Sequence, residues 1–236
     1  SIYELHMLIF WICVWIGVAV FGVMFYSIFK HRKSKGAVAS QFHESLGLEV
    51  LWTAIPAVIL IAMAVPATTT LIKMYDTTNA DVDIKITGHQ WKWQYDYLGE
   101  DVGFFSNLTT SQDEIYDRAE KGENYLLEVD KHLVVPSGQK LRFLITSNDV
   151  IHAWWVPEIA VKKDAIPGYI NESWAIVPEG EEGIYRGQCA ELCGIQHGFM
   201  PIVLEVVTSD QYQVWLDEQR AGVEAEAAAA LGDFSY

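Results

Sequence analysis

Two cysteines, a histidine and a methionine lie close together in the stretch GQCAELCGIQHGFM, which begins at Gly187. Cys189 and Cys193 are separated by three residues, and His197 and Met200 follow within seven residues of the second cysteine. Thiolate, imidazole and thioether groups are soft or borderline ligands that select copper or zinc over calcium or magnesium. The spacing therefore indicates a transition-metal site.

Three other interpretations of the cysteines remain open. In an oxidising compartment Cys189 and Cys193 could form a disulfide, although so small a loop would stabilise the fold little. A redox dithiol normally uses the tighter Cys-x-x-Cys spacing, and neither interpretation gives His197 or Met200 a role. Structural zinc held by two Cys and two His would leave Met200 unused and could not transfer electrons. We therefore favour copper.

The second thiol distinguishes this site from a single-copper site. Cys193, His197 and Met200 alone resemble a blue-copper loop, which takes a further histidine from a distant strand. His152, in NDVIHAWWVP, follows the apolar run LRFLITS and suits that role. With Cys189 as a second bridging thiolate, two copper ions could share one electron. Such a centre changes little in geometry on reduction and favours electron transfer over chemistry on a substrate.

Two uncharged segments near the N-terminus predict membrane-spanning helices. Residues 7–29 and residues 50–72 each comprise 23 residues without a charge. As helices they would reach ~35 Å, enough to cross a hydrocarbon core of ~30 Å. A cleaved signal peptide is disfavoured, because the first apolar run is too long and no small-residue cleavage site follows it. Cys13, inside the first span, is interpreted as a packing residue.

The loop between the spans predicts their orientation. Lys30, Arg32, Lys33 and Lys35 follow the first span, which places this loop on the cytoplasmic or matrix side and both termini outside. From Tyr75 onward there are 28 Asp and Glu against 11 Lys and Arg, a formal charge of −17. Such a domain repels nucleic acid and attracts basic proteins.

The outer domain predicts an antiparallel β-sandwich or barrel. Residues 81–86 alternate polar and apolar, as a strand with one buried face should. In TGHQWKWQYDY the aromatic residues have the opposite parity, so we expect a bulge or bend at Gly88 and His89. Short segments separated by Pro and Gly turns suit such a fold. Further strands are expected at residues 125–130, 132–136, 139–147, 172–178, 183–189 and 200–207.

The predicted organisation is a membrane-anchored α+β chain in three parts. Residues 1–74 form a transmembrane helical hairpin, and residues 75–207 form the β domain. Residues 208–236 form a C-terminal helix and an acidic tail, with the helix expected over 208–230. Residues 99–124 are acidic and weakly patterned, which predicts a long surface excursion.

Along almost its whole length the chain resembles subunit II of the haem–copper cytochrome c oxidases. The resemblance rests on the two-span hairpin and on the motifs GHQWKWQYDY, DVIHAWWVP, DAIPG and GQCAELCGIQHGFMPI. It implies a cupredoxin domain that holds a dinuclear copper centre, CuA. The resemblance implies these copper ligands: Cys189 and Cys193 as bridges, His152 and Met200 on one copper, and His197 and the backbone carbonyl of Glu191 on the other.

The resemblance also implies roles outside the copper site. The side chain of Glu191 would bind a Mg²⁺ ion shared with subunit I, and Trp91 would receive electrons from cytochrome c. Glu49 would lie near the start of a proton pathway, although a helix-start acid explains it as well. Asp96 and Asp149 match acidic positions of the cytochrome-binding face. The aromatic residues that follow Trp91 in its motif are interpreted as packing residues.

The implied function is that of the electron-accepting subunit of a respiratory cytochrome-c oxidase. Electrons from cytochrome c would pass through the copper pair to haem in subunit I, where dioxygen is reduced to water and protons are pumped. The implied partners are subunit I, other oxidase subunits, cytochrome c and the lipid membrane, and nucleic acid is not among them. The expected location is a bacterial plasma membrane, with the copper domain and both termini periplasmic. A mitochondrial inner membrane is the alternative.

Three rival functions fit the sequence less well. A quinol oxidase subunit would share the fold but lack the thiol and histidine set. A membrane-tethered single-copper carrier would not need Cys189. Nitrous oxide reductases carry a similar copper motif, but a two-span hairpin before it does not fit them.

Overall fold

The computed structural model describes residues 2–232. It divides into two compact units, Ser1–Met74 and Tyr75–Tyr236. Residues 233–236, which belong to the predicted acidic tail, lie outside the described residues.

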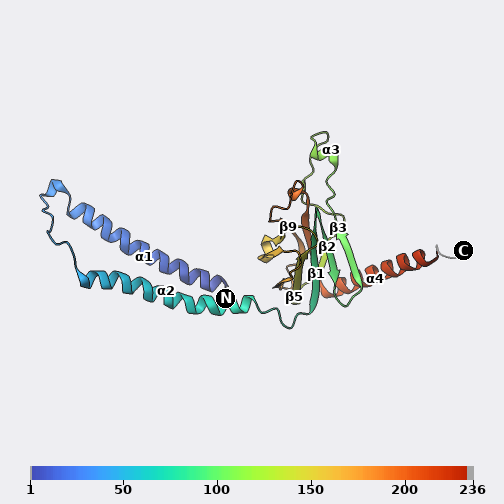
Figure 1. The fold of residues 1–236 in the computed structure, drawn as a ribbon, viewed down its shortest axis with the longest axis horizontal. Coiled ribbons are helices and arrows are strands. Elements are labelled where there is room, and N and C mark those ends of the chain that lie inside the picture. The colour runs from blue at the N-terminus through green and yellow to red at the C-terminus, as the bar shows by residue number, and fades with distance from the viewer. Residues whose placement is uncertain (1, 233–236) are drawn as a thin grey trace. The chain divides into compact units, whose positions relative to one another are not determined.

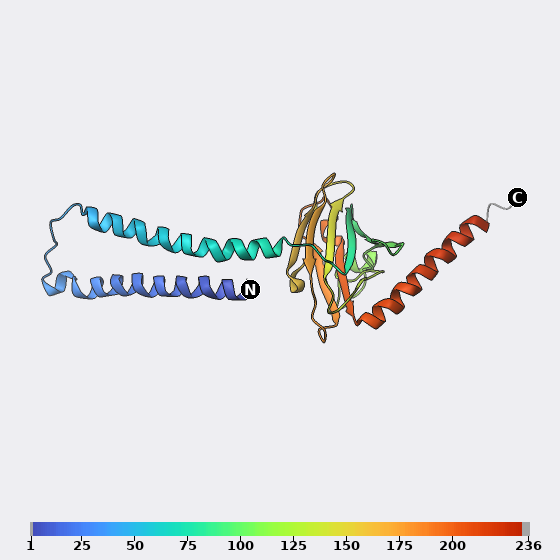
Figure 2. The same cartoon turned by 90° about the horizontal axis from the view of Figure 1, so that it is seen from below.

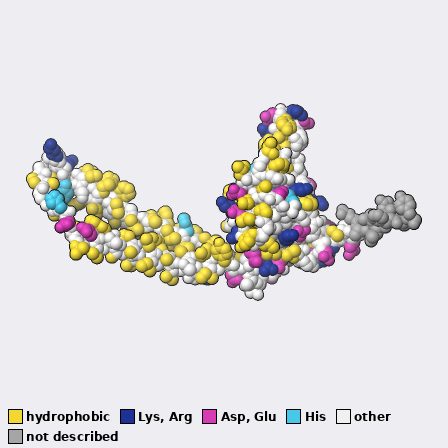
Figure 3. All heavy atoms as spheres, in the orientation of Figure 1, with side chains coloured by type: hydrophobic (Ala, Val, Ile, Leu, Met, Phe, Trp, Pro, Cys, Tyr) yellow, Lys and Arg dark blue, Asp and Glu magenta, His cyan; other side chains and the backbone are white. Residues whose placement is uncertain are grey.

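The first unit is a pair of long apolar helices, α1 (Ile2–Lys30) and α2 (Leu46–Met74). Each has 29 residues, and their most apolar windows have a mean hydropathy of 2.6 and 2.2. Hydrophobic side chains cover both helices, and charged and histidine side chains gather at the loop that joins them (Figure 3). That loop contains the short helix η1 (Lys33–Lys35). A helix that is apolar all round suits lipid rather than water, so the expected helical hairpin is confirmed.

The second unit contains two five-stranded sheets (Figures 1 and 2). The first sheet has the spatial order β3 (Val102–Ser106), β2 (Lys92–Tyr97), β1 (Val82–His89), β5 (Leu141–Ser147) and β8 (Asn171–Ala175). The second has the order β4 (Leu133–Pro136), β10 (Pro201–Val207), β9 (Gly183–Cys189), β6 (His152–Val156) and β7 (Val161–Ala165). Short helices α3 (Gln112–Ile115), η2 (Pro157–Ile159) and η3 (His197–Phe199) lie in loops, and α4 (Ser209–Gly232) follows β10.

The core of this unit follows from period-2 alternation along the strands. On β5, Leu141, Phe143 and Ile145 are fully buried while the residues between them are partly exposed. Trp154 on β6 lies with its ring centroid 5.1 Å from that of Phe143, which links the two sheets. The sandwich is antiparallel except for two parallel pairs, β1 with β5 and β4 with β10.

The expected bulge or bend at Gly88 and His89 is wrong. Strand β1 continues through His89, which lies opposite Lys92 on β2, and Gln90 and Trp91 form the turn between the two strands. The parity of the aromatic residues changes because a hairpin turn separates two strands. The consequence for function is that Trp91 sits at the tip of a hairpin.

Two further expectations about strands are wrong. Residues 125–130 form turns and one isolated bridge, Val129 with Leu108, in place of a strand. Strand β3 lies within the predicted surface excursion, where Val102 and Phe104 are buried against the core. Two buried positions among acidic neighbours are too few to produce a clear periodic signal.

Candidate metal centre

Two strands of the second sheet bring the predicted metal ligands together. Cys189 ends β9 and lies opposite Trp154 of β6, whose first residue is His152. The next pair along the sheet joins Gln188 to Pro201, the first residue of β10. Residues 189–200 therefore form a closed loop at one end of the sheet, and His152 lies beside its first residue.

The side chains from these two segments form one continuous cluster. The Sγ atoms of Cys189 and Cys193 are 3.8 Å apart. The Sγ atom of Cys189 lies 3.9 Å from Nδ1 of His152 and 3.3 Å from the carbonyl oxygen of Glu191. The ligand atoms of His152 and the two cysteines all lie within 4.8 Å of one another, a separation that one metal site can span.

The second thiol has its own pair of neighbours. The Sγ atom of Cys193 lies 3.5 Å from Nδ1 of His197 and 3.6 Å from the Sδ atom of Met200. Both cysteines are free thiols, and their separation is far longer than a disulfide bond of ~2.05 Å. All six predicted copper-ligand groups are thus within contact distance of a cysteine sulfur.

The cluster is largely closed to water. His152 is fully buried, and Met200, Cys193 and Cys189 are 2%, 3% and 7% exposed. His197 is half-buried. A dry group of two thiols, two imidazoles and a thioether has the donor chemistry that copper prefers, so the residues present fit the copper centre that the resemblance implies.

The electrostatics of the cluster favour deprotonation of one thiol first. Burial disfavours the thiolate of Cys189, but hydrogen bonds from His152 and from the backbone N–H of Ala153 outweigh it and lower the pKa of that thiol. Burial, followed by repulsion from the Cys189 thiolate, raises the pKa of Cys193. A metal cation that bridged the two sulfurs would remove this repulsion, because it would neutralise both charges.

The imidazole of His152 is oriented by a carboxylate. Its Nε2 atom lies 2.9 Å from Oδ1 of Asp149, and Nδ1 faces the thiol of Cys189. Burial opposes the protonated ring, but these two partners outweigh it and raise the pKa of His152. Burial likewise opposes the carboxylate of Asp149, and hydrogen bonds from His152 and two backbone N–H groups lower its pKa.

Two tryptophans contact the loop that carries the cysteines. Trp91 is half-buried, and its indole Nε1–H donates to the carbonyl of Cys193 at 3.2 Å. Trp93 is fully buried, and its Nε1–H donates to the carbonyl of Met200 at 3.1 Å. The interpretation of Trp93 as a core residue is correct, but it is incomplete because this side chain also fixes a ligand-bearing residue.

The remaining predicted side chains have no contact with a cysteine sulfur among the described residues. Asp96 on β2 lies 3.9 Å from Lys85 and accepts a hydrogen bond from Gln94 at 3.1 Å. The Glu191 side chain is exposed, and Glu49 lies in the first turn of α2 in the other unit. The structure thus brings together the six ligand groups, Trp91 and Asp149, while Asp96 and Glu49 have other surroundings.

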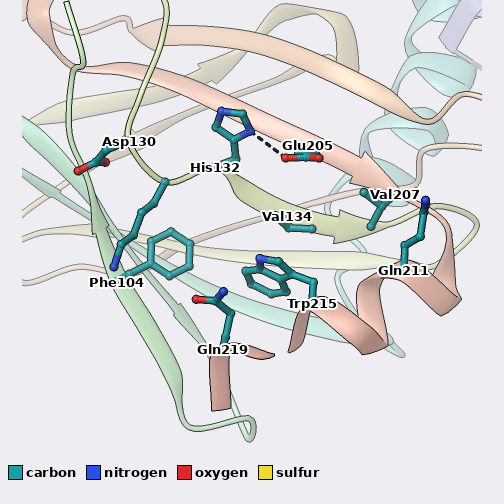
Figure 4. Close-up of a pocket in the computed structure, with 10 residues that line it drawn as sticks. Phe104, Asp130, His132, Val134, Glu205, Val207, Gln211, Trp215 and Gln219 are labelled. Carbon is teal, nitrogen blue, oxygen red and sulfur yellow. Dashed lines mark hydrogen bonds and ion pairs between the residues drawn. The ribbon is translucent and has the colours of Figure 1, made fainter. Parts of the chain in front are cut away.

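The unit also contains a cavity of about 530 Å³ that is separate from the metal cluster (Figure 4). Trp215 of α4 and Phe104 of β3 form apolar walls of the cavity. Nδ1 of His132 lies 2.8 Å from Oε2 of Glu205. Nε2 of the same ring lies 3.0 Å from Glu128. Both nitrogens of His132 are therefore engaged by carboxylates.

Comparison with known proteins decides the family. A family profile described as the periplasmic domain of cytochrome c oxidase subunit II matches residues 82–207, and one described as its transmembrane domain matches residues 1–69. The chain belongs to the cytochrome c oxidase subunit II family. Its second unit is accordingly the cupredoxin-like domain of that family, and its two helices are the membrane domain.

Individual relatives agree with this assignment. A "probable cytochrome c oxidase subunit 2" of Rickettsia prowazekii is 37% identical over 216 residues, which cover 92% of this chain and 67% of the relative. The corresponding protein of Mycosarcoma maydis is 37% identical over 227 residues, covering 93% of this chain and 86% of the relative. Relatives from bacteria and from mitochondria are both similar, so the comparisons establish a membrane location and leave the type of membrane open.

Two solved structures resemble the second unit. The periplasmic domain of subunit II from Bradyrhizobium japonicum is 38% identical, with a TM-score of 0.54 over 62% of this chain and 98% of that chain. A mixed-disulfide intermediate between a thioredoxin-like protein and a subunit II is 38% identical, with a TM-score of 0.51 over 62% of this chain and 96% of that chain. As a family member, the chain is one subunit of the cytochrome c oxidase complex, and its family implies a copper centre.

Some residues that shape the site were not assigned to it from the sequence. Gln90 donates through its side chain to the carbonyl of Cys193 at 2.8 Å, and its position in GHQWKW gave no separate signal. Gly88 is the second: a Cβ atom there would lie 2.8 Å from Cδ2 of His152. A glycine in the middle of a strand pattern is a general sign of close backbone approach, and it could have been interpreted in that way.

Proposed function

We propose that this chain is the electron-accepting subunit of a respiratory cytochrome c oxidase and that its loop at residues 189–200 binds two copper ions. A copper pair bridged by two thiolates, when bound, accepts and donates one electron at a time. Cys189 and Cys193 would bridge the pair, His152 and Met200 would complete one copper, and His197 with the Glu191 carbonyl would complete the other. The chain would pass electrons from cytochrome c to haem in subunit I, which reduces dioxygen and pumps protons.

The observation that carries this proposal is how the four outer ligands divide between the two thiols. Cys189 has His152 and the Glu191 carbonyl as neighbours, and Cys193 has His197 and Met200. Each sulfur therefore contacts one proposed ligand of each copper, as bridging thiolates must. A single zinc ion would need neither two outer ligands at each thiol nor Met200.

The protein around the site would supply orientation and exclude water. Burial of His152 and Met200 keeps their ligand atoms facing the sulfurs, and it limits the rearrangement of solvent when the charge of the site changes. Trp91, half-exposed and bonded to the Cys193 carbonyl, would receive electrons from the cytochrome. We expect the exposed side chain of Glu191 to bind Mg²⁺ shared with subunit I.

The remaining roles belong to the same proposal. Asp96 and Asp149 would contribute negative charge towards a basic cytochrome, and Glu49 would lie near the start of a proton pathway. The basic loop at residues 30–35 would face the cytoplasm or matrix, with both termini and the copper domain on the opposite side. Both thiols must be reduced before they bind copper. A thioredoxin-like protein forms a mixed disulfide with a relative, which suggests how the thiols of this chain could be kept reduced.

Metal analysis of the purified oxidase complex tests the proposal. We expect two coppers at this site per chain and an electron paramagnetic resonance signal split equally by two copper nuclei. Cys189→Ser should abolish that splitting, whereas Cys13→Ser, in the first span, should preserve it and serves as the matched control. A single copper, or zinc, in fully loaded wild-type protein contradicts the proposal.

A further inference from the structure

The carboxylate of Asp149 lies between the strand that begins with His152 and the hairpin tip that carries Trp91. Its Oδ1 atom lies 2.9 Å from Nε2 of His152 and accepts the backbone N–H of Val150 at 2.7 Å. Its Oδ2 atom accepts the backbone N–H of Gln90 at 2.7 Å. Both oxygens are thus engaged, one by the His152 ring and the Val150 backbone and the other by the Gln90 backbone.

The contact with His152 determines which nitrogen of the ring can bind a metal. A carboxylate at Nε2 favours the proton on that nitrogen, so Nδ1, which faces Cys189, is the nitrogen that would bind a metal. The ring has little other freedom: Gly88 lies against one side, and the ring of Trp93 packs edge-on with the centroids 5.9 Å apart. Asp149 is the only polar partner of this ring, apart from the thiol, among the described residues.

The contact with Gln90 fixes the hairpin tip from the other side. While its backbone N–H binds Asp149, the Gln90 side chain donates to the carbonyl of Cys193 at 2.8 Å. The Trp91 indole donates to the same carbonyl at 3.2 Å. Gly194 makes this approach possible, since a Cβ atom there would lie 3.0 Å from Cζ2 of Trp91 and the backbone has φ +119°.

We propose that Asp149 and Gln90 are positioning residues, which form a clasp that holds the Trp91 ring and the His152 imidazole in a fixed arrangement around the two thiols. This inference depends on the proposed function, because it assigns the two residues to the copper centre. It gives Asp149 a role that does not depend on contact with a cytochrome. Asp149 acts by accepting the N–H groups of the His152 ring and of the Val150 and Gln90 backbone, and not only through its charge.

Asp96 provides a matched control for this distinction. The side chains of Asp96 and Asp149 are equally exposed, at 29%. Among the described residues, Asp96 has Lys85 and Gln94 as its ion-pair and hydrogen-bond partners, and neither belongs to the clasp. If an acid acts only through long-range attraction to a basic partner, then Asp→Asn at either position should raise KM and weaken the dependence on salt.

The first test compares Asp149→Asn, Asp149→Glu and Asp96→Asn in the assembled oxidase. An asparagine has one acceptor oxygen for donors on two sides, so its amide N–H₂ must face either Gln90 or His152. For Asp149→Asn we expect roughly tenfold faster copper loss to a chelator, as is typical when the partner of a ligating histidine is removed, together with changed copper hyperfine splitting. Asp149→Glu keeps the charge but not the geometry, and it should change the same two measurements. Asp96→Asn should leave both at the wild-type value.

The outcomes separate the clasp from the proposed function. Two coppers in the wild type, with wild-type chelation and spectrum in both Asp149 variants, would overturn the clasp alone. No copper in the wild type would overturn the proposed function and the clasp with it. A wild-type spectrum in Asp149→Glu beside a changed salt dependence in Asp149→Asn would show that Asp149 acts only as a charge.

The second test asks whether Gln90 acts through Trp91. We expect Gln90→Ala to slow oxidation of saturating cytochrome c by about tenfold while the copper spectrum stays unchanged. In a Trp91→Phe background the same substitution should have little further effect, because the indole that it positions is already absent. Equal slowing by Gln90→Ala in both backgrounds would mean that the two residues act independently and would overturn this part of the clasp.

Discussion

Gly88 is the residue whose replacement tests the packing of the metal centre most directly. A Cβ atom at this position would lie 2.8 Å from Cδ2 and 3.1 Å from Cγ of the His152 ring. Ordinary contacts begin at 3.4 Å, so Gly88→Ala requires the ring to move by at least about 0.6 Å. The ring cannot move freely, because Trp93 packs against it and Asp149 holds its Nε2 atom.

The expected cost of this overpacking is about 1–3 kcal/mol. The backbone of Gly88 has no left-handed φ, so the cost comes from the collision and not from backbone strain. We would measure urea unfolding of the copper-free full chain in detergent, following tryptophan fluorescence. The copper-loaded chain should also show altered hyperfine splitting, since His152 is displaced relative to Cys189.

Gly122→Ala is the matched control, because its Cβ atom would make only an ordinary contact of 3.6 Å with Glu114. We expect its unfolding free energy to stay within about 0.5 kcal/mol of the wild type. If Gly88→Ala unfolds like this control and gives a wild-type copper spectrum, then His152 is not held against β1 and the reasoning is refuted.

Three further predictions follow from other contacts. Trp91→Phe removes the indole N–H that binds the Cys193 carbonyl. It should slow cytochrome c oxidation in steady-state assays while leaving the copper spectrum intact. Unchanged turnover would exclude Trp91 from the electron-transfer path. Trp215→Ala should lower the unfolding free energy by about 2–3 kcal/mol, because this ring of α4 packs on Tyr97 with the ring centroids 5.1 Å apart. A urea midpoint equal to that of the wild type would contradict this prediction. A hydrogen bond from Ser137 lowers the pKa of Glu182. The stabilisation of the folded state by this bond is therefore present above the unfolded-state pKa of Glu182 and is lost as pH falls through its folded-state pKa. Ser137→Ala should reduce the acid-dependent part of the unfolding free energy, and a pH dependence parallel to that of the wild type would contradict the assignment.

Most of the site could be predicted because its ligands are concentrated in one short segment. Cys189 to Met200 carry soft donors at spacings that neither a core strand nor a disulfide explains. His152 was found because its motif follows a strongly apolar strand. The two helices were equally clear, since 23 consecutive uncharged residues have few other interpretations. Comparison with known proteins then confirmed the family resemblance.

The parts that the sequence did not reveal depend on contacts between distant strands. Gln90 reaches Cys193 across 103 residues of chain, and nothing in its local pattern indicates that partner. Gly88 lies beside His152 because β1 and β6, which belong to different sheets, approach each other at this end. Asp149 was assigned to the cytochrome-binding face because it matches an acidic position of the family. Only the three-dimensional arrangement shows that one of its oxygens contacts His152 while the other accepts the backbone N–H of Gln90.

The pairing of Gln188 with Pro201 has a consequence for how such domains can diverge. This pairing closes the ligand loop at its base. Residues 189–200 could therefore be replaced as one segment while β9 and β10 keep their register. Together with a change at His152, replacement of this one insert could convert the domain between forms with and without the ligand set. An ancestral scaffold could therefore gain or lose its metal without having to refold.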